Sequence, residues 1–357
     1  MLKHNWTWAL LGVIALVVRF FAVQFPAKTE IIYSRSFFPG IRNVIDVSVS
    51  RLPFPTIYLF LLVLGFIIFR YFFKVRFKKG WKDKAFYSVR YFFNFVGAVV
   101  FFFLVLWGFN YQRVPIFQQL SLKPIPLENG QLMKELDLTH NILSQLRPHI
   151  TDSDSAIQQT LDFPELEKIV RATTSENLYL MGLNFTGNPR TKQLYPSGLL
   201  RKLGILGIYF PFTGESYIDP TLHPLDKPFT IAHEMAHSYG VTNEGEANFI
   251  GWVICTNSDN PLLQYSGQLR LFRYQMKDLY KKDSTAYRTF LGQLNKGVRN
   301  DLTSIADNNR KIVPISLELS RRSNDLFLKT QGVKAGVNSY AQLTMLAYAW
   351  RKSLKGE

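Results

Sequence analysis

Three long apolar stretches near the start of the chain limit what this sequence can fold into more than any other feature. They run approximately from Trp6 to Phe25, from Ile57 to Phe73 and from Phe86 to Tyr111. Each approaches the roughly 20 residues that a helix needs to cross a bilayer. The segment from Val99 to Trp107 has no polar residue, so a helix there would be apolar on all sides. We therefore predict three transmembrane helices in a lipid bilayer.

A cleaved signal peptide is an alternative interpretation of the first stretch. Arg19 interrupts that stretch, however, and no small-x-small cleavage site follows it. Arg19, Arg70 and Arg90 each lie near one end of their stretch, where a long side chain can reach the lipid headgroups. We therefore favour three retained helices over a signal peptide, and also over three buried helices of a soluble protein.

Basic residues are concentrated in the same part of the chain and predict its orientation. Up to Tyr111 there are 14 Lys and Arg against 3 Asp and Glu, which gives +11 of the total net charge of +16. Such an excess beside apolar runs is typical of membrane topology and not of a nucleic-acid-binding surface. The segment from Lys74 to Lys84 holds six basic residues in eleven, so we place it in the cytoplasm. Residues 1–111 then form a membrane anchor, and residues 112–357 form an extracytoplasmic domain.

Residues 112–357 have the composition of a globular domain, with helical patterns interrupted by Pro and Gly. The segment from Leu206 to Asp219 is rich in β-forming residues and predicts one or two strands, with Pro211 confining them to a sheet edge or bulge. The predicted fold class is α+β, mostly α, with a small sheet. The expected helices run from about Gly130 to Leu146, from Phe163 to Thr173, through His233, from Glu244 to Ile254, from Tyr265 to Tyr280 and from Tyr340 to Ser353.

The motif His233-Glu234-x-x-His237 carries the clearest chemical signal. Two His four residues apart on a helix point the same way, so both can hold one Zn²⁺ while Glu234 reaches a metal-bound water. In a chain of this composition the motif is expected on the order of 0.003 times by chance, so the match is informative. A helix carrying it could be capped by Asp226 and ended by Gly240.

A catalytic zinc site needs a third protein ligand, and a single cysteine excludes a site built from cysteines. Glu244 and Glu246 both follow the turn at Gly240 and, being two residues apart on a helix, cannot both face the metal. Glu244 shares a helix face with Asn248, which could hydrogen-bond a ligand His. We therefore favour Glu244 over Glu246 as the third ligand.

Few other side chains are candidates for the chemistry. Tyr265, His223 and His149 could each stabilise an oxyanion, although an isolated His or Tyr is more often a packed or capping residue. Cys255 lies in an apolar run and is expected to be a buried small hydrophobic residue and not a nucleophile. An extended peptide could pair with a strand at Ile208 to Phe212 or at Ser216 to Ile218.

The motif and the segment Glu244-x-x-Ala247-Asn248 together resemble the Glu-zincin pattern of several membrane-associated metallopeptidase families. Asn248 stands where Asp is commoner, and a neutral amide polarises an imidazole less than a carboxylate does. The wider sequence resembles a bacterial family of membrane-anchored zincin-like proteins, domain of unknown function 3810. The resemblance also covers the three apolar stretches, Gly207 to Glu215, Tyr265-Ser266-Gly267, Leu328 to Gly332 and Ser339-Tyr340.

These features predict a zinc metallopeptidase anchored in the bacterial inner membrane. Its ligands to Zn²⁺ would be His233, His237 and Glu244. Glu234 would act as general base toward the zinc-activated water and then as proton donor to the leaving amine of a peptide or protein substrate. The alternative is a non-hydrolytic zinc-binding membrane sensor or assembly factor. An intramembrane protease is excluded because charged residues surround the motif.

The predicted orientation can be tested with fusion reporters in bacterial cells. We expect alkaline phosphatase fused after Glu357 to be active, because the enzyme needs an oxidising extracytoplasmic compartment. The same enzyme inserted between Lys74 and Lys84 should be inactive. An inactive C-terminal fusion would contradict the predicted orientation and indicate that the C-terminus lies in the cytoplasm.

Overall fold

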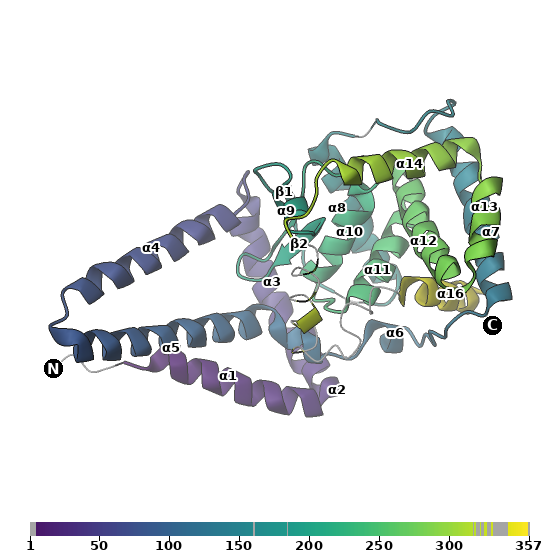
Figure 1. Cartoon of the computed structure of the whole chain (residues 1–357). Helices are drawn as coiled ribbons and strands as arrows, with labels where there is room; N and C mark the ends of the chain where they lie inside the picture. Colours follow the sequence, from purple (N-terminus) through teal and green to yellow (C-terminus); the bar gives the residue numbers. More distant parts are fainter. Residues whose placement is uncertain are drawn as a thin grey trace. The chain divides into compact units, whose positions relative to one another are not determined.

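The computed structural model of the chain describes residues 5–159, 161–183, 185–316, 318, 322, 325, 326, 330 and 342–355. The chain is mostly helical with a small three-stranded sheet, as predicted (Figure 1). It divides into two compact units. The N-terminal unit consists of Met1–Val114 and Phe210–Glu215, and the C-terminal unit consists of Pro115–Tyr209 and Ser216–Glu357.

Three helices of the N-terminal unit are long and apolar enough to cross a membrane, judged by length and composition. They are α1 (Thr7–Gln24), α4 (Ile57–Arg76) and α5 (Gly80–Leu106), and they confirm the three predicted apolar helices. Helix α5 begins before the predicted Phe86 because lysines, which favour helix, continue it beyond the apolar run. The other elements of this unit are α2 (Pro26–Thr29), the π-helix η1 (Glu30–Phe37), α3 (Phe38–Val47), η2 (Val49–Arg51) and η3 (Gly108–Gln112).

Helices α1 and α5 lie against each other over much of their length (Figure 1). Glycines allow this close approach, because a Cβ added at Gly12 would lie 2.6 Å from the Cα of Gly97. At the start of α1, the Asn94 side-chain oxygen accepts a hydrogen bond from the Trp8 backbone N–H at 3.0 Å. Asn94 of α5 thereby satisfies one of the backbone donors that the first turn of a helix leaves free.

The C-terminal unit holds most of the sheet and the remaining helices. Its long helices include α7, α10, α11 and α12, each within a few residues of its predicted range. Its elements are α6 (Ile116–Gln119), α7 (Asn129–Leu146), η4 (Arg147–His149), α8 (Phe163–Leu180), β1 (Thr191–Gln193), α9 (Leu199–Lys202), β2 (Gly207–Phe210), β3 (Glu215–Ile218), α10 (Lys227–Ser238), α11 (Glu244–Thr256), α12 (Pro261–Lys282), α13 (Ser284–Gln293), α14 (Lys296–Arg310) and α16 (Leu343–Leu354).

The predicted elements differ from the observed ones where packing overrides local preference. Helix α8 continues seven residues beyond the predicted end at Thr173, to Leu180, and its buried Thr174 bonds the Val170 carbonyl at 2.6 Å. Strand β1 and helices α13 and α14 were not predicted. The predicted helix start at Tyr340 and most of the segment from Leu328 to Gly332 lie outside the described residues.

The sheet has the strand order β1-β3-β2, so β3 is central and β2 lies at one edge. Strand β1 runs parallel to β3, with Lys192 opposite Tyr217. This order rules out Ser216 to Ile218 as the strand that adds a substrate peptide, because a central strand has both of its edges paired. The other predicted segment, at Ile208, lies in β2.

Helix α10 occupies the centre of the C-terminal unit and packs against α8, α11 and α12. Ile231, Ala232, Met235 and Ala236 are fully buried in its hydrophobic core. The motif His233-Glu-x-x-His237 therefore lies on a buried helix and not on a solvated helix face. A second hydrophobic cluster joins α7, α12, α13 and α14.

The packing of α7 generates a stability prediction with a matched control on the same helix. Leu136 is fully buried, whereas Leu138 is 41% exposed. We expect Leu136→Ala to lower the free energy of unfolding by about 2–5 kcal/mol, and Leu138→Ala to change it by less than about 0.5 kcal/mol. Urea denaturation of the full-length protein in detergent measures both. Equal effects would contradict the packing of α7.

Candidate metal centre

The start of α10 is stabilised by a side chain from another helix. Asp226 precedes the helix, but its side chain makes no capping hydrogen bond and instead accepts one from the Arg273 guanidinium at 2.7 Å. The Phe229 backbone N–H, in the first turn, donates to the Ser266 hydroxyl at 3.2 Å. The predicted cap by Asp226 is therefore wrong, because an arginine of α12 competes for the carboxylate and Ser266 of the same helix supplies the acceptor.

The end of α10 is formed by the predicted turn at Gly240. Gly240 has a φ of 84°, in the left-handed region that favours glycine. Its N–H donates to the His237 carbonyl at 2.9 Å, and the Val241 N–H donates to the Ala236 carbonyl at 3.2 Å. These two bonds define a Schellman motif. They bring the backbone of Val241 back toward the last turn of the helix.

This turn orients one of the two imidazoles. The Val241 carbonyl lies 2.6 Å from His237 Nδ1, so that nitrogen donates to the carbonyl and Nε2 is left to act as a ligand. His233 differs, because among the described residues its buried Nδ1 has no hydrogen-bond partner. The Phe229 ring stacks on the His233 ring with centroids 6.3 Å apart.

Glu244 enters the site as the first residue of α11. Asn243 caps this helix, since its side-chain oxygen accepts hydrogen bonds from the N–H groups of Gly245 and Glu246. The Glu244 Oε2 lies 3.2 Å from His233 Nε2 and 3.4 Å from His237 Nε2. The two Nε2 atoms are 3.2 Å apart. Three donor atoms on two helices thus converge, and their side chains are only 9% to 15% exposed.

The spacing of these donors fits a zinc ion. Donors held about 2.0–2.1 Å from one ion at tetrahedral angles lie roughly 3.3–3.4 Å from one another. The three separations in the cluster are 3.2, 3.2 and 3.4 Å. Two imidazoles and one carboxylate are also a ligand set that zinc takes in catalytic sites. The residues present therefore fit the metal, and binding of the metal stays a prediction.

Mutual electrostatics in the cluster favour a positive charge. Burial lowers the pKa of His237, but the carboxylates of Glu244 and Glu234 outweigh this effect and raise it to about 9. Burial raises the pKa of Glu244, but the two imidazoles outweigh it and hold that pKa well below its usual range. The pKa of His233 is lowered, chiefly by burial. A proton on His237 and a metal ion are thus alternative counter-charges for Glu244.

Glu234 lies beside the cluster and against the edge strand. A Cβ added at Gly207 of β2 would lie 2.7 Å from the Glu234 Oε1, so the strand can approach this closely only because Gly207 has no side chain. Burial raises the pKa of Glu234 to about 8, although His237 and a hydrogen bond from the Tyr209 backbone N–H lower it. A carboxyl group with a pKa near neutrality can both accept and donate a proton.

The two glutamates considered as the third ligand have different partners, and Glu244, which the sequence favoured, is the one beside the imidazoles. Glu246 turns away from the imidazoles, and its Oε1 accepts a hydrogen bond from the Phe117 backbone N–H at 3.1 Å. Asn248 was expected to bond a ligand His, but its side chain donates to the Tyr274 hydroxyl at 3.3 Å. That expectation is wrong because Asn248, although on the same helix as Glu244, faces α12. A backbone carbonyl orients His237 instead.

Two of the three oxyanion candidates are engaged in other contacts, and the third is exposed. Tyr265 is fully buried and its hydroxyl donates to Asp301 at 2.6 Å. His223 is buried between Ser304, 3.0 Å from its Nε2, and the Leu225 N–H, 3.2 Å from its Nδ1. His149 is exposed at the end of η4. All three are accounted for by packing, capping or solvent exposure.

The remaining sequence signals have structural explanations. Cys255 is fully buried, as predicted, and burial raises the pKa of its thiol. A Cβ added at Gly267 would lie 2.6 Å from the Cys255 Cβ, so this glycine lets α12 approach α11. Sequence reasoning missed Gly207 as a contact of Glu234, although a glycine next to β-forming residues signals close approach of another group.

Comparison with known proteins gives the family. The family model described as Protein of unknown function (DUF3810) matches residues 33–348. The chain belongs to this family. The match covers the residues of the candidate metal centre and supports the resemblance to this family, but it does not test the resemblance to zincin metallopeptidases. Neither the comparison with curated proteins nor the comparison with solved structures found a match.

Elemental analysis can distinguish Glu244 from Glu246 as a ligand. In the full-length protein purified in detergent we expect about one zinc per chain, as in a three-ligand zinc site. Glu244→Ala should lose the zinc because it removes the only carboxylate donor of the cluster. Glu246→Ala is the matched control and should keep it. Folded wild-type protein without zinc, or equal loss in both variants, would contradict this ligand set.

Proposed function

We propose that this protein is a zinc-dependent peptidase anchored in a membrane. The observation that carries the proposal is the tetrahedral spacing of the donor atoms of His233, His237 and Glu244, with Glu234 beside them. A structural zinc site is closed by four protein ligands, whereas a catalytic site leaves one position open. Among the described residues, the His, Cys, Asp and Glu side chains offer a group of three here.

Each residue of the site has a defined role in the proposed hydrolysis. A zinc ion held by His233, His237 and Glu244 would supply Lewis acidity toward a peptide carbonyl and a water molecule. Glu234 accepts the proton of the attacking water and passes it to the leaving amine. His237 keeps its Nε2 available because Nδ1 donates to the Val241 carbonyl. The apolar surroundings of α10 keep bulk water away from these groups.

Strand β2 supports an extended peptide as the substrate. It lies at the edge of the sheet, and Gly207 and Tyr209 contact Glu234. A peptide can add to such an edge through main-chain hydrogen bonds, which recognise extended backbone and not a particular side chain. A scissile bond held along β2 would lie close to the carboxyl group that transfers the proton.

The apolar helices and the basic residues support the proposed location. We propose that α1, α4 and α5 cross the inner membrane of a bacterial cell. The segment from Lys74 to Lys84 joins α4 to α5 and is strongly basic, which favours the cytoplasmic side. An odd number of crossings then places the C-terminal unit outside the cytoplasm. Its substrates would be extracytoplasmic peptides or proteins.

Substitution of Glu234 tests the proposed activity. In Glu234→Gln the side chain keeps its shape but cannot accept a proton. We expect it to bind zinc like the wild type and to lose peptide hydrolysis by about 10²–10⁴-fold, the usual contribution of a general base. The measurement is cleavage of a diverse peptide mixture by the zinc-loaded full-length protein, followed by mass spectrometry.

Glu165→Gln is the matched control, because Glu165 is exposed on α8 and should be silent. Equal cleavage by the wild type and by Glu234→Gln would mean that the activity comes from a contaminant. A zinc-loaded wild type that cleaves no peptide would favour the non-hydrolytic sensor or assembly factor.

A further inference from the structure

The turn between β2 and β3 belongs to a different unit from most residues of the strands that it joins. By its contacts, Phe210–Glu215 is part of the N-terminal unit, whereas Gly207 to Tyr209 and Ser216 to Ile218 are part of the C-terminal unit. The chain thus passes through the N-terminal unit for six residues between two neighbouring strands of one sheet. This turn is bound by two polar contacts and one aromatic cluster.

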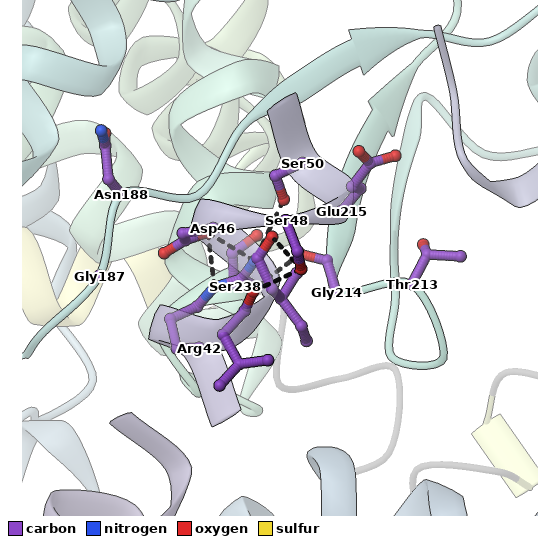
Figure 2. A network of polar contacts seen from close by, with 12 residues as sticks. Arg42, Asp46, Ser48, Ser50, Gly187, Asn188, Thr213, Gly214, Glu215 and Ser238 are labelled. Carbon is purple, nitrogen blue, oxygen red and sulfur yellow. Dashed lines mark hydrogen bonds and ion pairs between the residues drawn. The ribbon is translucent and has the colours of Figure 1, made fainter. Parts of the chain in front are cut away.

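The first polar contact is made by a fully buried arginine of α3. Arg42 donates from its Nε and NH2 to the Asp46 carboxylate at 2.9 and 2.6 Å, and from NH1 to the Gly214 carbonyl at 2.5 Å (Figure 2). A buried charge is stable only when it is paired and hydrogen-bonded. Asp46 supplies the pairing, and the turn supplies an acceptor for the remaining arm of the guanidinium.

The second polar contact is made by Glu215, at the end of the turn. Glu215 is fully buried, and its Oε2 accepts hydrogen bonds from the Thr56 backbone N–H at 2.9 Å and hydroxyl at 2.7 Å. Thr56 is the residue before α4, so one of the free N–H groups near the start of that helix is satisfied by the turn. A carboxylate at a helix N-terminus is also favoured by the helix dipole.

Close packing also holds the turn against α3 and α4. Gly214 has a φ of 65°, and a Cβ added there would lie 2.7 Å from the Ile45 Cδ1. Any other residue would be strained by this φ and would push against the side chains of Ile45 and Arg42. The Phe60 ring of α4 packs on Phe210 and Phe212, with centroids 5.0 and 5.3 Å away. Each end of the turn is thereby held by the N-terminal unit.

Both strands that leave this turn bond to Glu234. The Tyr209 backbone N–H of β2 bonds to the Glu234 carboxylate. The Ser216 hydroxyl, at the next residue after the turn, donates to the Glu234 carbonyl at 2.8 Å. Ser216 follows Glu215 directly, and Tyr209 precedes Phe210 directly. A displacement of the turn would therefore move the two groups that contact Glu234.

We propose that Arg42 and Thr56 are positioning residues for Glu234. They hold the turn Phe210–Glu215, and through the covalently continuous strands they fix β2 and β3 against the glutamate. The turn then has a second role besides joining two strands, because it fixes the two strands that contact Glu234. The importance of this role for catalysis rests on the proposed function, but the positioning itself does not.

Hydrogen exchange of the full-length protein in detergent tests the proposal. Arg42→Met removes the charge and keeps most of the side-chain length, and Thr56→Val removes the hydroxyl with little change of shape. In both variants we expect amide exchange between Leu206 and Asp219 to become about tenfold faster or more, since local opening sets the exchange rate. Exchange in α7 and α12 should not change, and zinc content should stay at the wild-type value because the three ligands lie on α10 and α11.

Arg51→Met is the matched control, because Arg51 is exposed in the same unit. Unchanged exchange of the sheet in a variant with wild-type exchange in α5 would overturn the proposal. If Arg42→Met also speeds exchange throughout α5, the N-terminal unit of this variant has unfolded. The exchange of the sheet in Thr56→Val then tests the proposal. In a protein that hydrolyses peptides, Thr56→Val should lower kcat at unchanged zinc content. Faster sheet exchange in a protein without peptidase activity would support the positioning and reject only the proposed function.

Discussion

The burial of ionisable side chains on α10 is the constraint on which the rest of the C-terminal unit depends. His233, Glu234 and His237 lie on a helix whose other side chains form a hydrophobic core. Charged or unpaired polar groups are costly in such surroundings. Glu244 pairs with the two imidazoles. The Val241 carbonyl accepts a hydrogen bond from His237, and the Tyr209 backbone N–H donates one to Glu234. Helix α11 and the edge strand both supply partners for these groups.

The same requirement accounts for the shape of the neighbouring turns. Gly240 permits the left-handed turn that returns the Val241 carbonyl to His237, and Asn243 starts α11 in time for Glu244 to reach both imidazoles. At the neighbouring residue of the motif, Gly207 lets β2 approach Glu234. Two glycines with no chemistry of their own thus determine the distances at the site, because each allows the backbone to come where a side chain would prevent it.

Several features of this protein could be predicted from local sequence. The three apolar helices follow from length and composition, since a helix that is apolar on all sides needs no information about its neighbours. The direction shared by His233 and His237 follows from helix periodicity, and the end of α10 follows from Gly240. The region of the sheet was predicted from β-forming residues, although β1 was missed because three residues carry too little pattern.

By itself, the sequence determined the class of fold, the apolar helices, the motif on a helix and the two glutamates that could complete it. Only the tertiary structure decided which glutamate faces the imidazoles, because that choice depends on where α11 begins relative to the Val241 turn. It also showed which residues form hydrogen-bonded pairs: Asp226 with Arg273, Asn248 with Tyr274, and Tyr265 with Asp301. Each of these partners is at least 26 residues away in the chain. Tertiary packing determines which of these distant donors and acceptors meet. A local sequence pattern therefore cannot predict the pairs.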